Sequence, residues 1–319
     1  MKPLLALLLS LPLAAFAADK PVDAGPYVPS PQSVVADMLK LADIRSTDFV
    51  VDLGSGDGRI VLTAAKVFGA SGFGVEIKDE LVKLSNEAAR REGVEDRVKF
   101  IKADLFKTDI SKATVLTMYL LPNTVNLLKD KLLTELRPGT KVLSHDYPLT
   151  GWIPEKYVQM DLEDKVAISG VTTTLIYLYM VPAKVAGRWS AALPVAAGQG
   201  QLSLRLKQQV TRVSGSGQLA GKPVELEDLK LHGDRLSFKL AGTRLAFAGQ
   251  VKGDAIEGEV DWAGKKSPWS AKMPPAVSRA PATLQLKQQL TRVSGSARLD
   301  GRDIPLEDVR LRGDRISFK

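Results

Sequence analysis

The sequence contains no cysteine and only two histidines, His145 and His232, among its 319 residues. Without cysteine the chain can form no disulfide, and it has no thiolate to act as a nucleophile or a metal ligand. Two histidines are too few for a zinc site built from several imidazoles, so we expect no metal site. Apolar residues make up 45% of the chain and charged residues 25%, a mixture typical of globular proteins, and this length predicts about two domains.

Long apolar runs are also scarce, and the clearest one is at the N-terminus. Lys2 precedes an apolar run from Leu4 to Phe16, and Ala15-Phe16-Ala17 places small residues at the positions that determine signal cleavage. Residues 1–18 are therefore interpreted as a secretory signal peptide, which predicts a periplasmic or cell-envelope location. The run is short for a transmembrane helix. The alternative is an uncleaved membrane anchor that leaves the following domain in the cytoplasm.

Acidic residues are sparse in the C-terminal part of the chain. From Gly187 to the end there are 22 Lys and Arg residues against 13 Asp and Glu, so the formal net charge of +8 arises wholly from this region. A basic surplus favours an anionic membrane surface or another acidic partner. The alternative is a set of solvated strand faces, because the charges are scattered and mixed with acids.

The hydrophobic pattern divides the chain into regions. Residues 19–31 form a Pro-rich segment, residues 32–182 alternate between strand-like and helix-like stretches, and residues from 187 onward show only short strands. Such alternation predicts an α/β domain, in which helices cover a parallel sheet. The predicted helices are 33–42, 60–68, 79–91 and 123–136. The predicted strands are 49–53, 72–77, 98–103, 114–120 and 141–144, then an antiparallel pair at 166–169 and 172–181 joined by a short turn.

The C-terminal region contains an internal repeat. Residues 204–239 match residues 284–319 at a constant offset of 80, and Trp189-Ser190-Ala191 recurs as Trp269-Ser270-Ala271 at the same offset. We therefore assign a first repeat to residues 187–268 and an incomplete second repeat to residues 269–319. Alternating leucines broken by glycines predict an all-β region, as a meander or a small barrel. Either the chain ends in a half repeat or the sequence is a fragment.

A glycine-rich loop follows the first predicted strand. In Asp52-Leu53-Gly54-Ser55-Gly56-Asp57-Gly58, three glycines at alternate positions let the backbone turn sharply and approach a ligand closely. The helix that follows directs free amides and the positive end of its dipole at the same point. The glycine spacing is one residue shorter than the Gly-x-Gly-x-x-Gly loop of dinucleotide enzymes. In addition, Asp52 would repel a pyrophosphate and attract a ligand that carries a sulfonium and an ammonium.

Carboxylates also end the next two predicted strands. Glu76 can accept hydrogen bonds from two ribose hydroxyls, and Asp104 can accept one from an adenine amine while the Leu105 amide donates to the ring. With Asp52, these acids end three successive strands, at the edge where open α/β sheets bind ligands. The arrangement favours S-adenosylmethionine over a nicotinamide dinucleotide.

Four segments together resemble one branch of the class I S-adenosylmethionine-dependent methyltransferases. They are Pro26-Tyr27-Val28-Pro29, the loop from Asp52 to Arg59, Met118-Tyr119-Leu120-Leu121-Pro122, and Leu136-Arg137-Pro138-Gly139 leading to Ser144-His145-Asp146. That branch contains the mitochondrial lysine methyltransferases of the adenine nucleotide translocase and the ATP synthase c subunit, with bacterial relatives. The resemblance covers residues 26–181, and the repeat region is a departure from the family.

The resemblance implies a Rossmann-like sheet of seven strands with a terminal antiparallel hairpin, and S-adenosyl-L-methionine as the cofactor. It also implies that residues 118–122 line the methyl-transfer face. Tyr119 and Asp146 are then the candidate catalytic residues, and the alternative for each is a structural role. The candidate cofactor-binding residues are Asp52, Gly54, Ser55, Gly56, Asp57, Gly58, Glu76, Asp104 and Leu105.

The function that the resemblance implies is protein lysine N-methylation. The Asn-Pro-Pro-Tyr motif of enzymes that methylate amides or base amines is absent, so we expect neither a nucleic acid nor glutamine as the substrate. Two alternatives remain open at this point. One is a small-molecule methyltransferase, and the other is a non-catalytic envelope binding module built on a methyltransferase scaffold.

Overall fold

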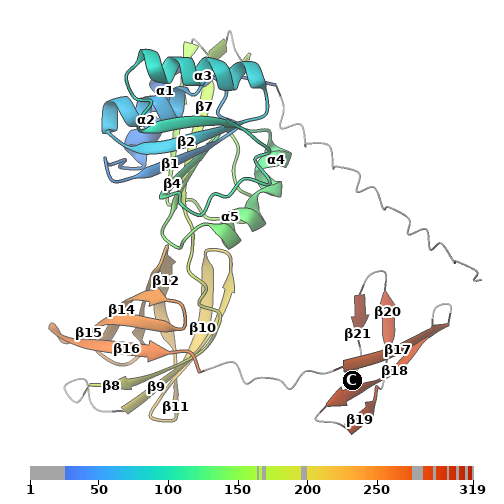
Figure 1. Cartoon of the computed structure of the whole chain (residues 1–319). Coiled ribbons are helices and arrows are strands. Elements are labelled where there is room, and N and C mark those ends of the chain that lie inside the picture. The colour runs from blue at the N-terminus through green and yellow to red at the C-terminus, as the bar shows by residue number, and fades with distance from the viewer. Residues whose placement is uncertain are drawn as a thin grey trace, which may run out of the picture. The chain divides into compact units, whose positions relative to one another are not determined.

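A computed structural model describes residues 26–163, 165–166, 170–194, 200–274, 283–289, 292–299, 302–306, 309–312 and 315–317 (Figure 1). The interpreted signal peptide at 1–18 and the first part of the Pro-rich segment lie outside the described residues. The chain forms two compact units. The first comprises residues through Lys184 with Gln208–Val213 and Leu229–Ser237; the second comprises Val185–Lys207, Ser214–Asp228 and Phe238–Lys319.

A seven-stranded sheet with the order β3-β2-β1-β4-β5-β7-β6 forms the centre of the first unit. Strands β1 to β5 are parallel, β7 pairs antiparallel with β5, and β6 pairs antiparallel with β7. The bounds are β1 Phe49–Leu53, β2 Ser71–Glu76, β3 Val98–Lys102, β4 Val115–Met118, β5 Lys141–His145, β6 Lys156–Asp161 and β7 Thr173–Met180. The α/β fold with a terminal antiparallel hairpin is therefore confirmed.

Helices cover both faces of this sheet (Figure 1). Successive side chains along β1 point to opposite faces, so each face has apolar residues for the helices to pack against. Val50 packs with α1 (Gln32–Leu41) and α2 (Arg59–Phe68) on one face. Val51 and Leu53 pack with α4 (Pro122–Leu127) and α5 (Lys129–Glu135) on the other. The remaining helix, α3 (Asp79–Arg91), packs with α2 against β3. Burial on both faces explains why the central strands β1 and β4 are nearly continuous apolar runs.

The strand order determines where the ligand crevice lies. From β1 the chain runs outward through β2 and β3, then returns to the other side of β1 as β4. This reversal makes a topological switch point at the carboxyl ends of β1 and β4, where open α/β sheets bind ligands. The glycine-rich loop begins at the end of β1 and therefore lies at that crevice.

Two predicted elements of this unit were wrong. The predicted helix at 123–136 is two short helices that meet at the buried Leu128, and the first begins at Pro122, whose fixed φ suits a first helical position. The strand that pairs with β7 is β6, not residues 166–169; Val166 is helical and exposed, and 167–169 lie outside the described residues. Strand β6 is mostly exposed, and only Val158 and Met160 pack against the core.

The second unit contains most of a nine-stranded sheet with the order β11-β10-β9-β8-β16-β15-β14-β13-β12. Its core includes Phe238, Phe247 and Trp269, with the two phenylalanine rings stacked and the indole edge-on to both. The bounds are β8 Gly187–Leu193, β9 Gly200–Gln209, β10 Arg212–Leu219, β11 Lys222–Val224, β12 Leu226–His232, β13 Arg235–Leu240, β14 Leu245–Lys252, β15 Ala255–Trp262 and β16 Lys265–Lys272.

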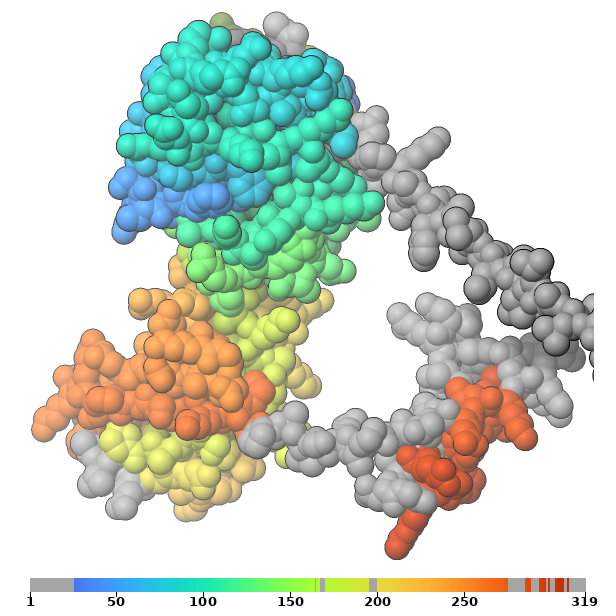
Figure 2. Space-filling model, in the orientation of Figure 1, coloured from blue at the N-terminus to red at the C-terminus, as the bar shows by residue number. Residues whose placement is uncertain are grey.

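The repeat boundary assigned between residues 268 and 269 falls inside β16. This strand carries Trp269 and pairs with β8, the strand that carries Trp189. The nine-stranded sheet therefore extends through Lys272. Beyond it lie a three-stranded sheet (β17 Thr283–Gln289, β18 Arg292–Leu299, β19 Arg302–Pro305) and a two-stranded one (β20 Arg310–Arg312, β21 Arg315–Ser317). Figure 2 shows the described residues in colour. Within them, no helix has the length and apolar character needed to cross a membrane.

Candidate functional site

The glycine-rich loop adopts the sharp turn that its sequence predicts. Gly54, Gly56 and Gly58 all have positive φ values, of 77°, 55° and 81°. A Cβ on Gly58 would lie 2.6 Å from the ring of Phe100 and 2.7 Å from Ser85, both of which are buried. Side chains at these positions would meet both backbone strain and steric overlap. The loop therefore needs glycine for its own conformation as well as for access by a ligand.

Asp52 is the most deeply buried acid beside this loop, with 2% of its surface exposed. Thr117 on β4 is the register partner of Asp52, and its hydroxyl donates to Asp52 Oδ1 at 2.7 Å. Burial, with the nearby Glu76 and Asp57, raises the pKa of Asp52 to about 7 against the opposing effect of the hydrogen bond from Thr117. A cation placed here would favour the ionised carboxylate. The site is thus poised to gain a charge when a cationic ligand binds.

Glu76 ends β2 with its carboxylate held by three backbone amides. Gly56 N–H donates to Oε2 at 3.0 Å, while Ile77 and Lys78 N–H donate to Oε1 at 2.8 and 3.0 Å. Each carboxylate oxygen offers about two lone pairs, so Oε1 is fully used and Oε2 retains capacity for one more hydrogen bond. A buried, oriented carboxylate of this kind suits a ligand that presents a hydroxyl to Oε2.

Residues 26–31, the described part of the Pro-rich segment, cross the mouth of the loop and are anchored on both sides. Ser30 Oγ pairs with His145 Nδ1 at 2.8 Å, and the Ser30 carbonyl accepts from Arg59 Nη1 at 2.6 Å. Arg59 also pairs in bidentate fashion with Asp57, at 2.9 Å from Nε to Oδ1 and 2.6 Å from Nη2 to Oδ2. The ring of Tyr27 lies directly over Gly56, where a Cβ would approach it to 2.4 Å.

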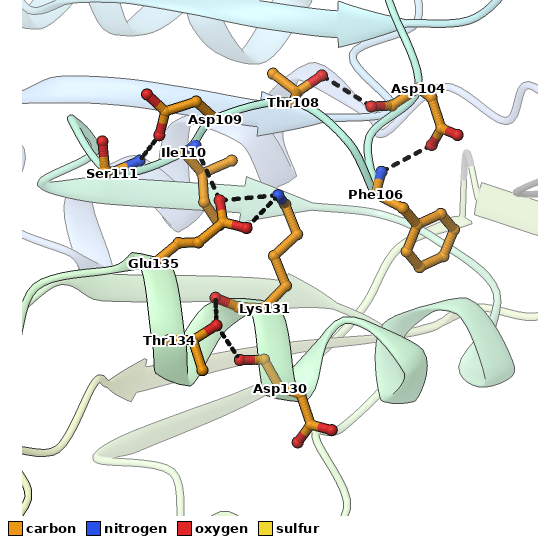
Figure 3. A network of polar contacts seen from close by, with 10 residues as sticks. All are labelled: Asp104, Phe106, Thr108, Asp109, Ile110, Ser111, Asp130, Lys131, Thr134 and Glu135. Carbon is orange, nitrogen blue, oxygen red and sulfur yellow. Dashed lines mark hydrogen bonds and ion pairs between the residues drawn. The ribbon is translucent and has the colours of Figure 1, made fainter.

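Asp104 shapes the turn after β3 (Figure 3). Its Oδ1 accepts from Phe106 N–H at 2.8 Å, and its carbonyl accepts from the Thr108 hydroxyl at 2.8 Å. Farther along the same connection, Ile110 N–H donates to Glu135 of α5, which also accepts from Lys131 Nζ at 2.7 Å. The second carboxylate oxygen of Asp104 makes no hydrogen bond among the described residues, so it remains available to a ligand in the pocket.

A hydrogen-bonded group of polar residues lies beyond the end of β5. Tyr119 O–H donates to Asp146 Oδ2 at 3.0 Å, and Lys165 Nζ lies 2.8 and 2.7 Å from the two oxygens of Asp146. Asp146 has a φ of 63°, which a non-glycine residue adopts only when its surroundings impose it. The His145 ring lies 3.9 Å from the Tyr119 ring, centroid to centroid. The structure therefore brings together the two residues proposed as catalytic.

The protonation states in this group follow from burial and charge. Burial would raise the pKa of Asp146, but His145, the Lys165 ammonium and the Leu175 amide outweigh it and hold the pKa below its usual value. Burial and the adjacent Asp146 raise the pKa of Tyr119. Burial lowers the pKa of His145 to about 4. At neutral pH the group therefore consists of a carboxylate, a protonated phenol and a neutral imidazole.

A pocket joins these features; its empty volume, with the open solvent at its mouth included, is about 870 Å³. It is lined by eight of the nine predicted cofactor residues: Asp52, Gly54, Ser55, Gly56, Asp57, Glu76, Asp104 and Leu105. Gly58 does not line the pocket, and Asp146 is connected to the pocket only through the hydrogen bond from Tyr119, which lines it. Within residues 118–122, Tyr119 and Leu120 line the pocket while Met118 is in the core.

The carboxylates that line this pocket fit S-adenosyl-L-methionine. Glu76 Oε2 would accept from a ribose hydroxyl and Asp104 from the adenine amine, and Asp52 would face the cationic methionine part. Sequence reasoning did not assign roles to Thr117, Lys165 or Ser30. Strand register brings Thr117 to Asp52, and the connection after β6 brings Lys165 to Asp146. Neither feature has a local sequence signal.

Comparison with known proteins agrees with this fit. Residues 52–156 match the ANTKMT methyltransferase domain. A protein-lysine N-methyltransferase of Saccharolobus islandicus is 42% identical over 157 residues, which are 49% of this chain and 93% of that protein. The Xenopus laevis lysine N-methyltransferase of the ATP synthase c subunit is 38% identical over 41% of this chain and 57% of its own length. An RNA methyltransferase from Salinibacter ruber, solved with S-adenosyl-L-homocysteine, is 44% identical over 50% of this chain and 96% of that chain, with a TM-score of 0.45.

Proposed function

The chain belongs to the protein-lysine N-methyltransferase family, and from this membership we propose that it methylates the ε-amine of lysine in a protein. The chain spans only 57% of the Xenopus laevis relative, so the substrate of that relative is not carried over to this chain. S-adenosyl-L-methionine, when bound, supplies an electrophilic methyl group on a sulfonium. The residues of the chain must then orient an amine, keep water away and accept its N–H groups.

One observation carries the proposal: the hydroxyl of Tyr119 points its proton at Asp146 and not into the pocket. Its oxygen is therefore left as an acceptor toward the pocket, and this suits a substrate that brings N–H donors. Lys165 keeps Asp146 ionised, so Asp146 cannot donate a proton back and reverse this direction. The raised pKa of Tyr119 excludes it as a base at neutral pH, so it orients the amine while solvent takes the proton.

The test is to incubate the full chain with labelled cofactor and a protein extract, then to hydrolyse the labelled protein. We expect label in methylated lysine. Tyr119→Phe should lower kcat by about tenfold, the loss expected for one hydrogen bond, without changing cofactor affinity. Tyr157→Phe is the matched control, because Tyr157 is exposed and bonds only to Gln159 among the described residues.

The other outcomes would contradict the proposal in distinct ways. Label confined to small molecules would indicate a small-molecule methyltransferase, and label in RNA would indicate a nucleic-acid substrate. A wild-type chain that fails to bind S-adenosyl-L-methionine in calorimetry would indicate a binding module without catalysis. Binding that disappears in Glu76→Ala would support the cofactor site, because Glu76 Oε2 retains acceptor capacity for a ribose hydroxyl.

The cellular location stays a proposal. The apolar run from Leu4 to Phe16 supports export to the periplasm or cell envelope. A phosphatase fused after Lys319 should then be active outside the cytoplasm. A phosphatase fusion that remains in the cytoplasm would instead support the uncleaved anchor. The domain would then lie where the cofactor is made.

A further inference from the structure

The charges of the nine-stranded sheet are segregated along the chain. Residues 187–224, which form β8 to β11, contain five basic residues and no acidic one. Residues 225–262, which form β12 to β15, contain eight acidic residues. Strand β16, which pairs with β8, again has basic residues only. The basic surplus of this region is thus concentrated on adjacent strands and is not scattered evenly.

Two arginines are directly opposite each other within this basic half. Arg188 on β8 is the register partner of Arg205 on β9, and both side chains are exposed. Neither forms an ion pair within the part of the chain that the structure describes. Like charges directly opposite in a sheet destabilise it. An anion between the two guanidinium groups would remove this repulsion.

Hydrogen-bond donors surround the arginine pair. Ser190 and Ser203 are the next register partners along β8 and β9, and Ser216 of β10 lines the same shallow pocket as the arginines. Gln201 donates to Ser190 Oγ at 2.9 Å. Beneath them Trp189 and Leu204 are buried in the core, so the outer face rests on a packed sheet. Two guanidinium forks beside hydroxyls match the oxygens of a phosphate group.

We propose that the outer face of β8, β9 and β10 binds the phosphate of anionic lipid headgroups. Charge complementarity and the breadth of the acid-free strands favour a membrane surface, to which each exposed Lys or Arg adds attraction. A single-stranded nucleic acid would require aromatic side chains for base stacking. The one aromatic residue between positions 187 and 224, Trp189, is buried. This surface shares no residue with the pocket for S-adenosyl-L-methionine, so it does not depend on the methyl-transfer proposal.

The internal repeat supplies the substitution for the test. At the offset of 80 residues, Gln285 takes the place of Arg205 and pairs with Ser296. Glutamine is therefore a residue that this strand pattern accepts at that position. The test variant is Arg188→Gln with Arg205→Gln in the full chain. The matched control is Lys239→Gln with Arg244→Gln, which removes the same charge from exposed positions in the acid-rich half.

The measurement is sedimentation with vesicles that contain phosphatidylglycerol, compared with phosphatidylcholine vesicles. We expect the protein to bind only the anionic vesicles. This binding should weaken as added salt shortens the Debye length. Each arginine should contribute about fivefold, so the double variant should bind about 30-fold more weakly, and the control should bind within about threefold of wild type. Circular dichroism spectra should show that both variants are folded.

Three results would overturn the proposal. The first is equal loss of binding in the test and control variants, which would indicate attraction by net charge alone. The second is saturable binding of inorganic phosphate without binding to vesicles, which would indicate a soluble ligand. The third is binding to single-stranded RNA but not to the anionic vesicles, which would indicate a nucleic-acid partner.

Discussion

The two sheets of this protein differ in whether polar side chains are buried beside them. Around the seven-stranded sheet the chain buries Asp52, Glu76, His145 and Lys165 together with several hydroxyl groups. In the nine-stranded sheet every buried side chain that the structure describes is apolar, as in the cluster of Phe238, Phe247 and Trp269. All charges of that sheet are at least partly exposed.

The difference indicates where ligands act on each region. Burial of an ionisable group costs free energy unless partners compensate, so a cluster of such groups indicates a site and not a scaffold. In the first region, partners such as the amides on Glu76 and the hydroxyl on Asp52 supply that compensation. The second region keeps an apolar core and leaves its charges on the surface, where an extended partner could be bound.

The largest expected effect compares one glycine from each region. Gly58→Ala combines positive φ with overlap against the buried Phe100 and Ser85, so it should destabilise the first region by about 3 kcal/mol and abolish cofactor binding. Gly221→Ala also has positive φ, at 79°, but has open space around it, so it should cost about 1 kcal/mol and leave cofactor affinity unchanged. Chemical denaturation and calorimetry would measure both. Equal effects would show that the loop has no special steric requirement.

A second prediction concerns the pH dependence of stability, which should arise from the first region. His145 has its pKa lowered to about 4 when folded, so its contribution is present above about pH 6.5 and is lost as the pH falls toward 4. Asp52 has its pKa raised to about 7, so its contribution is present below about pH 4 and is lost as the pH rises toward 7. These two contributions oppose each other in the wild type.

Single variants would separate the two groups. With Asp52→Asn, the free energy of unfolding should fall by about 2 kcal/mol from pH 7 to pH 5, because His145 must be protonated only in the unfolded chain. With His145→Gln, it should rise by about 2 kcal/mol over the same range. Lys239→Gln in the second region should change neither slope, since that side chain is exposed. Identical pH profiles for all three variants would contradict the assignment.

The smallest expected effect is on cofactor affinity. Because a cationic ligand needs Asp52 ionised and its pKa is about 7, binding should be about tenfold tighter at pH 8 than at pH 6. Asp52→Asn, measured by calorimetry at both pH values, should remove this tenfold difference while any titration of the ligand itself remains. If the wild type and the variant have the same pH dependence of cofactor affinity, the ionisation of Asp52 does not contribute to binding.

Much of the fold could be predicted because its signals are local. Strand β1 and helix α3 have the bounds predicted for them, since a buried apolar run and a long amphipathic period are read without knowledge of the partners. Strand β6 could not be predicted in the same way. It is an edge strand with Tyr157 exposed, so it lacks an apolar run and is defined only by its pairing with β7. Apolar residues near Val166 pointed to the wrong segment.

The amino-acid sequence by itself determined the α/β class, the glycine-rich loop and the acids that end β1 and β2, because all of these depend on spacing along one stretch of chain. The tertiary structure decided what those groups can do. Strand register places Thr117 on Asp52, and the connection after β6 places Lys165 on Asp146, which sets the direction of the Tyr119 hydroxyl. Protonation depends on burial and on neighbours distant in sequence, so only the folded chain determines it.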